Sequence, residues 1–146
     1  MPRNSWLIAA GTLSAAAALL HLAIIAGGPD WYRFFGAGEG MARMAERGML
    51  RPALITVGIA AILAVWAAYA FAGAGLIRRL PLMRTALILI SCIFLLRGLV
   101  LVPLFLLRPA TVGAFALWSS LIVLAYGMLY AIGTWHAWPA LSAKRR

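Results

Sequence analysis

One charged residue, Arg97, lies in the middle of an otherwise apolar segment, where a charged side chain could bind a ligand or take part in a reaction. The segment is CIFLLRGLVLVP. A central arginine costs about 2.5–3.5 kcal/mol on insertion scales, and such residues are candidates for function by default. The apolar runs contain no Asp, Glu or Lys to neutralise it. We therefore expect Arg97 to face a water-filled cavity, to bond hydroxyls and carbonyls, to pair with a loop acid that folds inward, or to bind a ligand oxygen.

Counting residues along neighbouring apolar runs predicts which side chains accompany Arg97. These side chains are aromatic or carry a hydroxyl. Trp66, Ser119 and Ser120 are expected at its depth, Tyr69 one turn deeper, and Trp31 and Tyr32 near an outer span end. They would make a small polar pocket lined by aromatic rings, in which Trp66 could hold the guanidinium by a cation–π contact. The alternative is an arginine satisfied by hydroxyls and helix carbonyls, which would serve helix packing alone.

A histidine close to the acidic loop is the second candidate for chemistry. His21 lies near the outer end of the first apolar run, and all three acids of the chain, Asp30, Glu39 and Glu46, follow it in the first loop. A His–carboxylate pair in an apolar pocket can transfer protons. His21 with Glu39 or Glu46 would therefore suit an isomerase-type enzyme. The alternative for His21 is an interhelical hydrogen bond.

The remaining metal-ligating residues argue against a haem or a metal site. His136 lies near the membrane side opposite to His21, so the two histidines cannot ligate one haem iron. The single cysteine, Cys92, cannot form an internal disulfide or a CxxC pair. No metal-site spacing of His, Cys and carboxylate is present. The cofactors that the sequence leaves open are a quinone or a lipid.

Helices in a bilayer must position these residues, because the composition is that of an integral membrane protein. Of 146 residues, 65% are hydrophobic and 11% are charged, and the mean hydropathy is +0.98. A soluble domain is about 45–50% apolar and about 25% charged. Four runs have the roughly 20 apolar residues that a span needs: residues 6–26, 53–77, 85–107 and 110–138. The sequence predicts an all-α fold, a single domain in which four transmembrane helices form a bundle.

The distribution of basic residues predicts the orientation. The net charge is +10, yet no aromatic–basic surface stripe or nucleic-acid motif is present, so we expect no nucleic-acid partner. Arg108 is alone in one short loop, and the basic residues on the other side are Arg3, Arg78, Arg79, Arg84 and the 144–146 tail. The positive-inside rule then predicts that both termini are cytoplasmic, and the location that we expect is a bacterial-type inner membrane. Four arginines of the first loop disturb this count.

The first loop, residues 27–52, is too polar to span and too apolar for a plain linker. From Glu39 to Arg47 its apolar and charged residues follow helical spacing, and Glu39 with Arg43 forms a favourable i,i+4 pair. This pattern predicts either an amphipathic helix on the outer interface or a re-entrant segment that carries carboxylates into a cavity.

From His21 to Ala86 the chain follows a recognisable layout. A first helix ends in glycines, and the segments YRFFGAGEGMARMAERG, RPAL, FAGAG and RRLPLMRTAL follow in order. This layout resembles the DoxX-like small four-helix bacterial membrane proteins. The resemblance implies a link to membrane redox systems, as a quinone-linked subunit or accessory protein. Those families usually carry a Glu in the second helix, where this chain has Trp66 and Tyr69. A looser resemblance, to the sterol-isomerase-like fold, rests on His21, Glu39, Glu46 and Trp66.

The leading hypothesis is an intramembrane cavity that binds a small lipophilic molecule with a carbonyl or anionic group, such as a quinone. Arg97 would anchor that group, Trp66 and Tyr69 would line the site, and the first loop would cover it. The alternatives are the isomerase-type enzyme, a non-catalytic accessory subunit and a small exporter. The expected partners are the lipid bilayer, a small hydrophobic ligand, and a second copy of the chain or a larger membrane complex.

Overall fold

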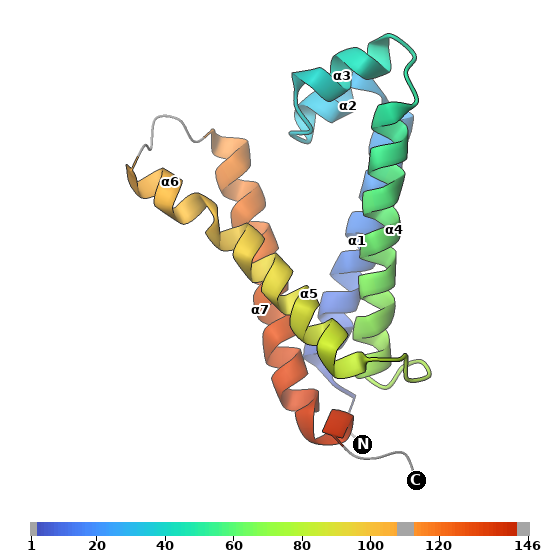
Figure 1. The fold of residues 1–146 in the computed structure, drawn as a ribbon, viewed down its shortest axis with the longest axis vertical. Coiled ribbons are helices and arrows are strands. Elements are labelled where there is room, and N and C mark those ends of the chain that lie inside the picture. Colours follow the sequence, from blue (N-terminus) through green and yellow to red (C-terminus); the bar gives the residue numbers. More distant parts are fainter. Residues whose placement is uncertain (1–2, 108–112, 143–146) are drawn as a thin grey trace. The chain divides into compact units, whose positions relative to one another are not determined.

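The structure is a computed structural model of the chain, and it describes residues 3–107 and 113–142. The described residues form helices and no strands, which confirms the predicted all-α class (Figure 1). The helices are α1 (Ser5–Gly27), α2 (Pro29–Phe34), α3 (Glu39–Glu46), α4 (Arg51–Gly73), α5 (Met83–Leu99), α6 (Leu101–Leu107) and α7 (Ala114–Ser142). Arg108 of the predicted short loop, the predicted start of the fourth span at residue 110 and the basic tail 144–146 lie outside the described residues.

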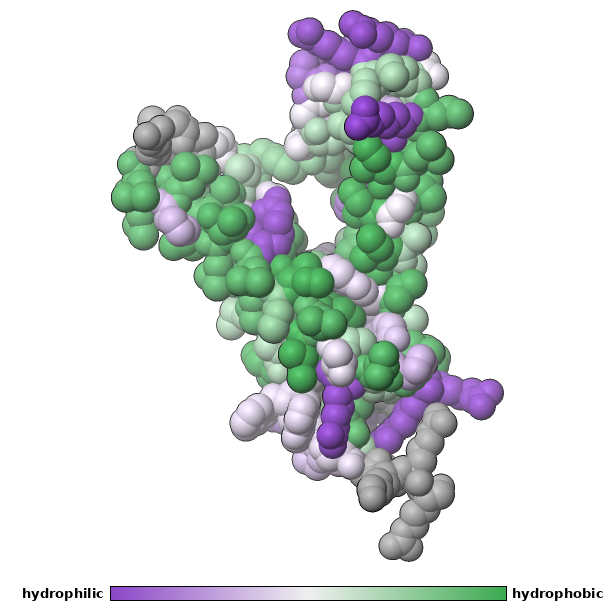
Figure 2. Space-filling model, viewed as in Figure 1, coloured by the Kyte–Doolittle hydropathy of each residue, from purple (hydrophilic) through white to green (hydrophobic). Residues whose placement is uncertain are grey.

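Four helical segments are long and apolar enough to cross a membrane. They are Ser5–Gly27, Arg51–Gly73, Met83–Leu107 and Ala114–Ser142. Large apolar side chains are exposed along all four, and hydrophobic residues cover the long helices in the space-filling view (Figure 2). Exposed apolar surface on this scale suits contact with lipid rather than water. The chain therefore has the helices of an integral membrane protein, as the sequence predicts.

The second span ends at Gly73 rather than near residue 77, and a glycine explains the end of the helix. Gly75 has a φ of 78°, its N–H donates to the carbonyl of Ala72 at 3.1 Å, and the N–H of Leu76 donates to the carbonyl of Phe71 at 2.9 Å. These two bonds make a Schellman motif, which satisfies carbonyls at a helix end and needs a left-handed residue. The FAGAG segment is thus the end of α4.

A break at Val100 divides the predicted third span into α5 and α6. Pro103 has no N–H to donate to the carbonyl of Leu99, four residues earlier, and its ring crowds that carbonyl. The N–H of Val100 makes the last bond of the preceding turn, to the carbonyl of Leu96 at 3.0 Å. The expected unbroken helix over residues 85–107 is therefore two helical segments.

The chain forms two compact units, which are described separately. The first-loop unit is residues 14–65 and comprises most of α1, then α2 and α3, and most of α4. The α5–α7 unit is residues 1–13 and 66–146, and it comprises the start of α1, the end of α4, and α5, α6 and α7.

The core of the first-loop unit is small. Ile24 of α1, Tyr32 of α2 and Ala42 of α3 are buried together, and Phe35 and Met41 are among the side chains packed against them. The helix α3 is amphipathic, because its apolar side packs in this core while its charged residues stay exposed. The amphipathic helix predicted from residue 39 onward is therefore present.

In the α5–α7 unit, α5 and α7 pack against each other along their length (Figure 1). Glycines allow the close approach: a Cβ on Gly98 would lie 2.8 Å from the Cα of Leu124, and one on Gly127 would lie 2.8 Å from the backbone nitrogen of Leu95. Small residues let membrane helices bring their backbones together. The start of α1 is tied to α7 by Asn4, whose side-chain amide donates to the carbonyl of Gly133 at 2.7 Å.

Candidate functional site

Arg97 lies in the last turn of α5, and its side chain makes one polar contact with the protein that the structure records. Its Nη1 donates to Oγ of Ser120 on α7 at 3.4 Å, and Ser120 is buried. None of the ion pairs among the described residues includes Arg97. A guanidinium has five N–H donors, so this single long bond leaves most of them free for another acceptor. Arg97 itself is exposed.

An aromatic cluster lies one turn before Arg97 on α5. The ring of Phe94 contacts Trp66 edge-on at 4.9 Å between centroids, and it contacts Tyr126 and Tyr130 of α7 at 5.5 Å each. Hydrogen bonds fix two of these rings, because Tyr126 donates to the carbonyl of Leu13 and Tyr130 to that of Trp66, both at 3.1 Å. Edge-on and offset rings are the favoured aromatic arrangements. Phe94 and Tyr130 are buried, so only Trp66 and Tyr126 of this cluster are partly exposed.

The predicted companions of Arg97 are found in different places. Ser120 contacts it, and Trp66 belongs to the neighbouring cluster, where its ring packs on Phe94 instead of the guanidinium. Tyr69 donates to the carbonyl of Pro81 at 3.1 Å, in the turn after α4. Ser119 donates to the carbonyl of Ala116 in its own helix at 3.1 Å.

Three other candidate residues belong to the first-loop unit. Trp31 packs against Phe35 with 5.6 Å between ring centroids. Tyr32 is buried, and its hydroxyl lies 3.5 Å from Oγ1 of Thr56. The Nδ1 atom of His21 lies 2.7 Å from the carbonyl oxygen of Ala17. Since a carbonyl only accepts, Nδ1 carries the proton, and His21 bonds within its own helix.

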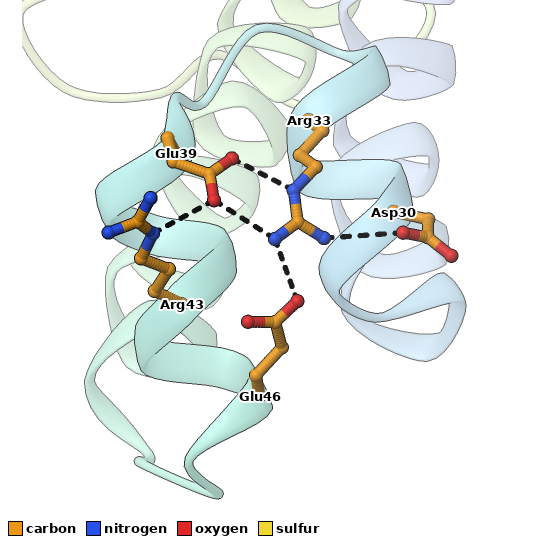
Figure 3. Close-up of polar contacts among 5 residues, drawn as sticks. All are labelled: Asp30, Arg33, Glu39, Arg43 and Glu46. Atoms are coloured by element: carbon orange, nitrogen blue, oxygen red, sulfur yellow. Dashed lines mark hydrogen bonds and ion pairs between the residues drawn. The ribbon is translucent and has the colours of Figure 1, made fainter.

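All three acids of the chain are held in one network with two arginines (Figure 3). The guanidinium of Arg33 bonds Glu39 at 2.9 Å, Glu46 at 2.7 Å and Asp30 at 3.3 Å, and Arg43 bonds Glu39 at 3.0 Å. The hydrogen bonds from Arg33 and Arg43 lower the pKa of Glu39 to about 2, and the same network raises the pKa of Arg33. An effective general base at neutral pH has a pKa near 7, so Glu39 in this state is a poor proton acceptor.

No group of three or more His, Cys, Asp or Glu residues within the described ranges could hold a metal ion. Cys92 is a free, exposed thiol on α5. No family model matches the sequence, and neither a curated protein nor a solved structure matches it. The resemblance to DoxX-like proteins therefore stays a prediction.

Sequence reasoning missed three aromatic members of the cluster. Phe94 stands three residues before Arg97, and Tyr126 and Tyr130 are four residues apart, so both pairs share a helix face. This spacing is the feature of the sequence that could have identified the aromatic cluster. Counting depth alone does not reveal which residues share a face.

Proposed function

We propose that the chain is an inner-membrane protein that binds a small lipophilic molecule through a carbonyl or anionic oxygen, a quinone being the typical case. Arg97 anchors that oxygen, with Ser120 beside it. Trp66 and Tyr126, the partly exposed rings of the cluster around Phe94, contact the apolar body of the ligand. A role in a membrane redox system, as the DoxX-like resemblance implies, belongs to the same proposal.

The observation that carries the proposal is a guanidinium within a span whose bonding capacity is largely unused. Arg97 lies inside the Met83–Leu107 span, and its recorded partner is a neutral hydroxyl at 3.4 Å. Every carboxylate of the chain is already bonded to Arg33 or Arg43. A ligand oxygen would supply the charge-assisted bond that the protein itself does not, and such bonds are the strong ones.

The same contacts favour ligand binding over the isomerase-type alternative. That enzyme needs a basic carboxylate beside His21, whereas Nδ1 of His21 is bonded to Ala17 and the low pKa of Glu39 makes it a weak base. An exporter would need a titratable carboxylate within the spans, and the sequence has none there. An accessory subunit remains compatible with ligand binding.

The proposed orientation places both termini and the basic turn at residues 78–84 in the cytoplasm, following the positive-inside rule. The first loop then lies on the outer side. Its arginines weigh against this assignment, but two of them, Arg33 and Arg43, are bonded to the three acids.

Titration with a short-chain ubiquinone tests the proposal. Quinones quench tryptophan fluorescence, and Trp66 lies in the adjoining cluster. We expect the affinity of Arg97→Leu to be about 10–100-fold below wild type, because a hydrogen bond to a charged group contributes about 1.5–3 kcal/mol. Arg97→Lys keeps the charge and should retain part of the affinity.

The matched control is Arg51→Leu, at the exposed start of α4, which should bind as wild type does. Circular dichroism and gel filtration in detergent establish that each variant is folded and monodisperse. Equal quinone affinity in wild type and Arg97→Leu would rule out Arg97 as the anchor.

A further inference from the structure

A groove runs along one flank of the paired helices α5 and α7. Its volume is about 630 Å³, and it is lined by Ile88, Cys92 and Leu95 of α5 and by Ala131, Trp135 and Trp138 of α7. From Ile88 to Leu95 it follows about 10 Å of helix axis at roughly 1.5 Å per residue. It is distinct from the Arg97 site, because Ile88 and Arg97 lie about half a turn apart around α5 at roughly 100° per residue.

The lining of the groove is almost entirely apolar. Two lining residues carry a hydroxyl, and both are more than nine-tenths buried, Ser91 with 5% and Thr134 with 6% exposed. Ser91 donates to the carbonyl of Leu87 in its own helix at 2.7 Å. The oxygen of Thr134 is covered by the protein. An occupant therefore needs an apolar segment rather than a hydrogen-bonding one.

A cation stands at one end of the groove. Arg84 lies in the first turn of α5, one turn before Ile88, and its Cζ is 5.1 Å from the centroid of the Trp138 ring. A cation–π contact of this kind holds the guanidinium over the ring. The span begins at Met83, so Arg84 lies at the membrane boundary, where Arg and Trp meet lipid headgroups. The described ion pairs do not include Arg84, so its charge is available there.

We propose that this groove binds an anionic phospholipid, with an acyl chain along the groove and the phosphate against Arg84. The apolar wall matches the hydrocarbon, the volume lies within the roughly 300–1,000 Å³ of small-molecule sites, and the cation lies at headgroup level. A phosphate oxygen bonded to the guanidinium adds a charge-assisted hydrogen bond to the attraction between opposite charges.

A second copy of the chain suits this groove less well than a lipid does. Two copies meeting here would bring two Arg84 side chains into the same region, within a protein of net charge +10. The acids that could neutralise them are all in the first-loop segment, bonded to other arginines. An anionic lipid brings the opposite charge with it.

Spin-labelled lipids measure this selectivity directly. The full chain is placed in phosphatidylcholine vesicles, and the motionally restricted fraction is compared for spin-labelled phosphatidylglycerol and spin-labelled phosphatidylcholine. We expect wild type to restrict phosphatidylglycerol preferentially and Arg84→Gln to lose that preference. Arg78→Gln is the matched control, since it removes the same charge from the exposed segment before α5, outside the groove lining, and it should keep the preference.

A second pair of variants locates the lipid in the groove. Ala131→Trp fills the groove and should abolish the preference, whereas Ala125→Trp, on an exposed part of α7 outside the lining, should preserve it. Alkylation of Cys92 with N-cyclohexylmaleimide blocks the groove of the folded wild-type protein and should act as Ala131→Trp does.

Three results would overturn the proposal. Equal losses in Arg84→Gln and Arg78→Gln would mean a diffuse attraction to the basic surface. Unchanged selectivity after the groove is blocked would place the lipid elsewhere. Efficient bismaleimide cross-linking of Cys92 between two chains in vesicles would show that a second copy fills the groove.

Discussion

Two arginines, Arg33 and Arg97, illustrate how the surroundings of a guanidinium decide its role. Arg33 lies between short helices and bonds three carboxylates at 2.7–3.3 Å. Arg97 lies within a span and bonds one hydroxyl at 3.4 Å. The first arginine joins α2 to α3, whereas most N–H donors of the second have no recorded partner among the described residues. The bonding of each side chain, rather than its charge alone, is why we propose a structural role for Arg33 and a binding role for Arg97.

The Arg33 network makes a prediction for the titration of Glu39. Its pKa is lowered from 4.5 to about 2, first by the hydrogen bond from Arg33 and then by that from Arg43. Because the folded pKa lies below the unfolded one, ionised Glu39 stabilises the first-loop unit fully above about pH 4.5. That contribution is lost as the pH falls towards 2.

Carbon NMR of the Glu39 side-chain carboxyl in detergent micelles measures this pKa. We expect Arg33→Gln to raise it towards 4.5, the value of a free glutamate. Arg47→Gln is the control, because Arg47 is exposed and has no recorded ion pair within the described segments. A wild-type midpoint above 4 would mean that the network does not persist in solution.

At the residue scale, the sequence allowed a partial prediction of the site. The position of Arg97 within an apolar run was visible, and depth counting selected Ser120, which lies on the helix that packs against α5. It also selected Tyr69, which bonds the carbonyl of Pro81. A turn carbonyl has no helical N–H partner and needs a donor from elsewhere. Counting depth cannot reveal that the hydroxyl of Tyr69 bonds this turn carbonyl instead of facing Arg97.

At the scale of the elements, close packing of α5 and α7 depends on glycine. A Cβ on Gly98 would meet the backbone of Leu124 at 2.8 Å, which is closer than ordinary van der Waals contact. Gly98→Ala should therefore force the helices apart and lower the free energy of unfolding by about 1–3 kcal/mol, the usual cost of overpacking. Thermal unfolding in detergent measures the loss.

The same substitution at Gly58 is the matched control. Gly58 lies in α4, and a Cβ there would have no other atom within 4 Å. Gly58→Ala should leave the unfolding temperature unchanged or raise it, because alanine has the higher helix propensity. If both substitutions have the same effect, helix propensity rather than contact with α7 explains the result.

Helices were easier to predict than their interruptions. The four spans follow from apolar runs, because a backbone in hydrocarbon must satisfy its polar groups internally and a helix does so. The break at Val100 is not visible in hydropathy, because Pro103 is apolar and yet cannot donate to the carbonyl of Leu99. The end of α4 is a second interruption of this kind. The predicted span extends to residue 77, but Gly75 of the FAGAG segment adopts a left-handed conformation and ends the helix at Gly73.

At the scale of the whole molecule, charged residues are distributed unevenly along the sequence. The first loop holds four arginines and all three acids of the chain. The segments that we propose to be cytoplasmic are Arg3, residues 78–84 and the 144–146 tail, and they contain no acid. Acids count little in the positive-inside rule. Because both groups of segments contain several basic residues, the sequence alone does not decide the orientation.

Cysteine labelling decides this orientation. In a Cys92→Ser background, Gly40→Cys and Ser142→Cys each add one thiol at an exposed position, the first in α3 and the second at the end of α7. A membrane-impermeant maleimide should label Gly40→Cys in intact spheroplasts and Ser142→Cys only after lysis. The reverse pattern would place Arg84 and its groove in the outer leaflet, and labelling of both in intact spheroplasts would mean that the helices do not cross in the predicted number.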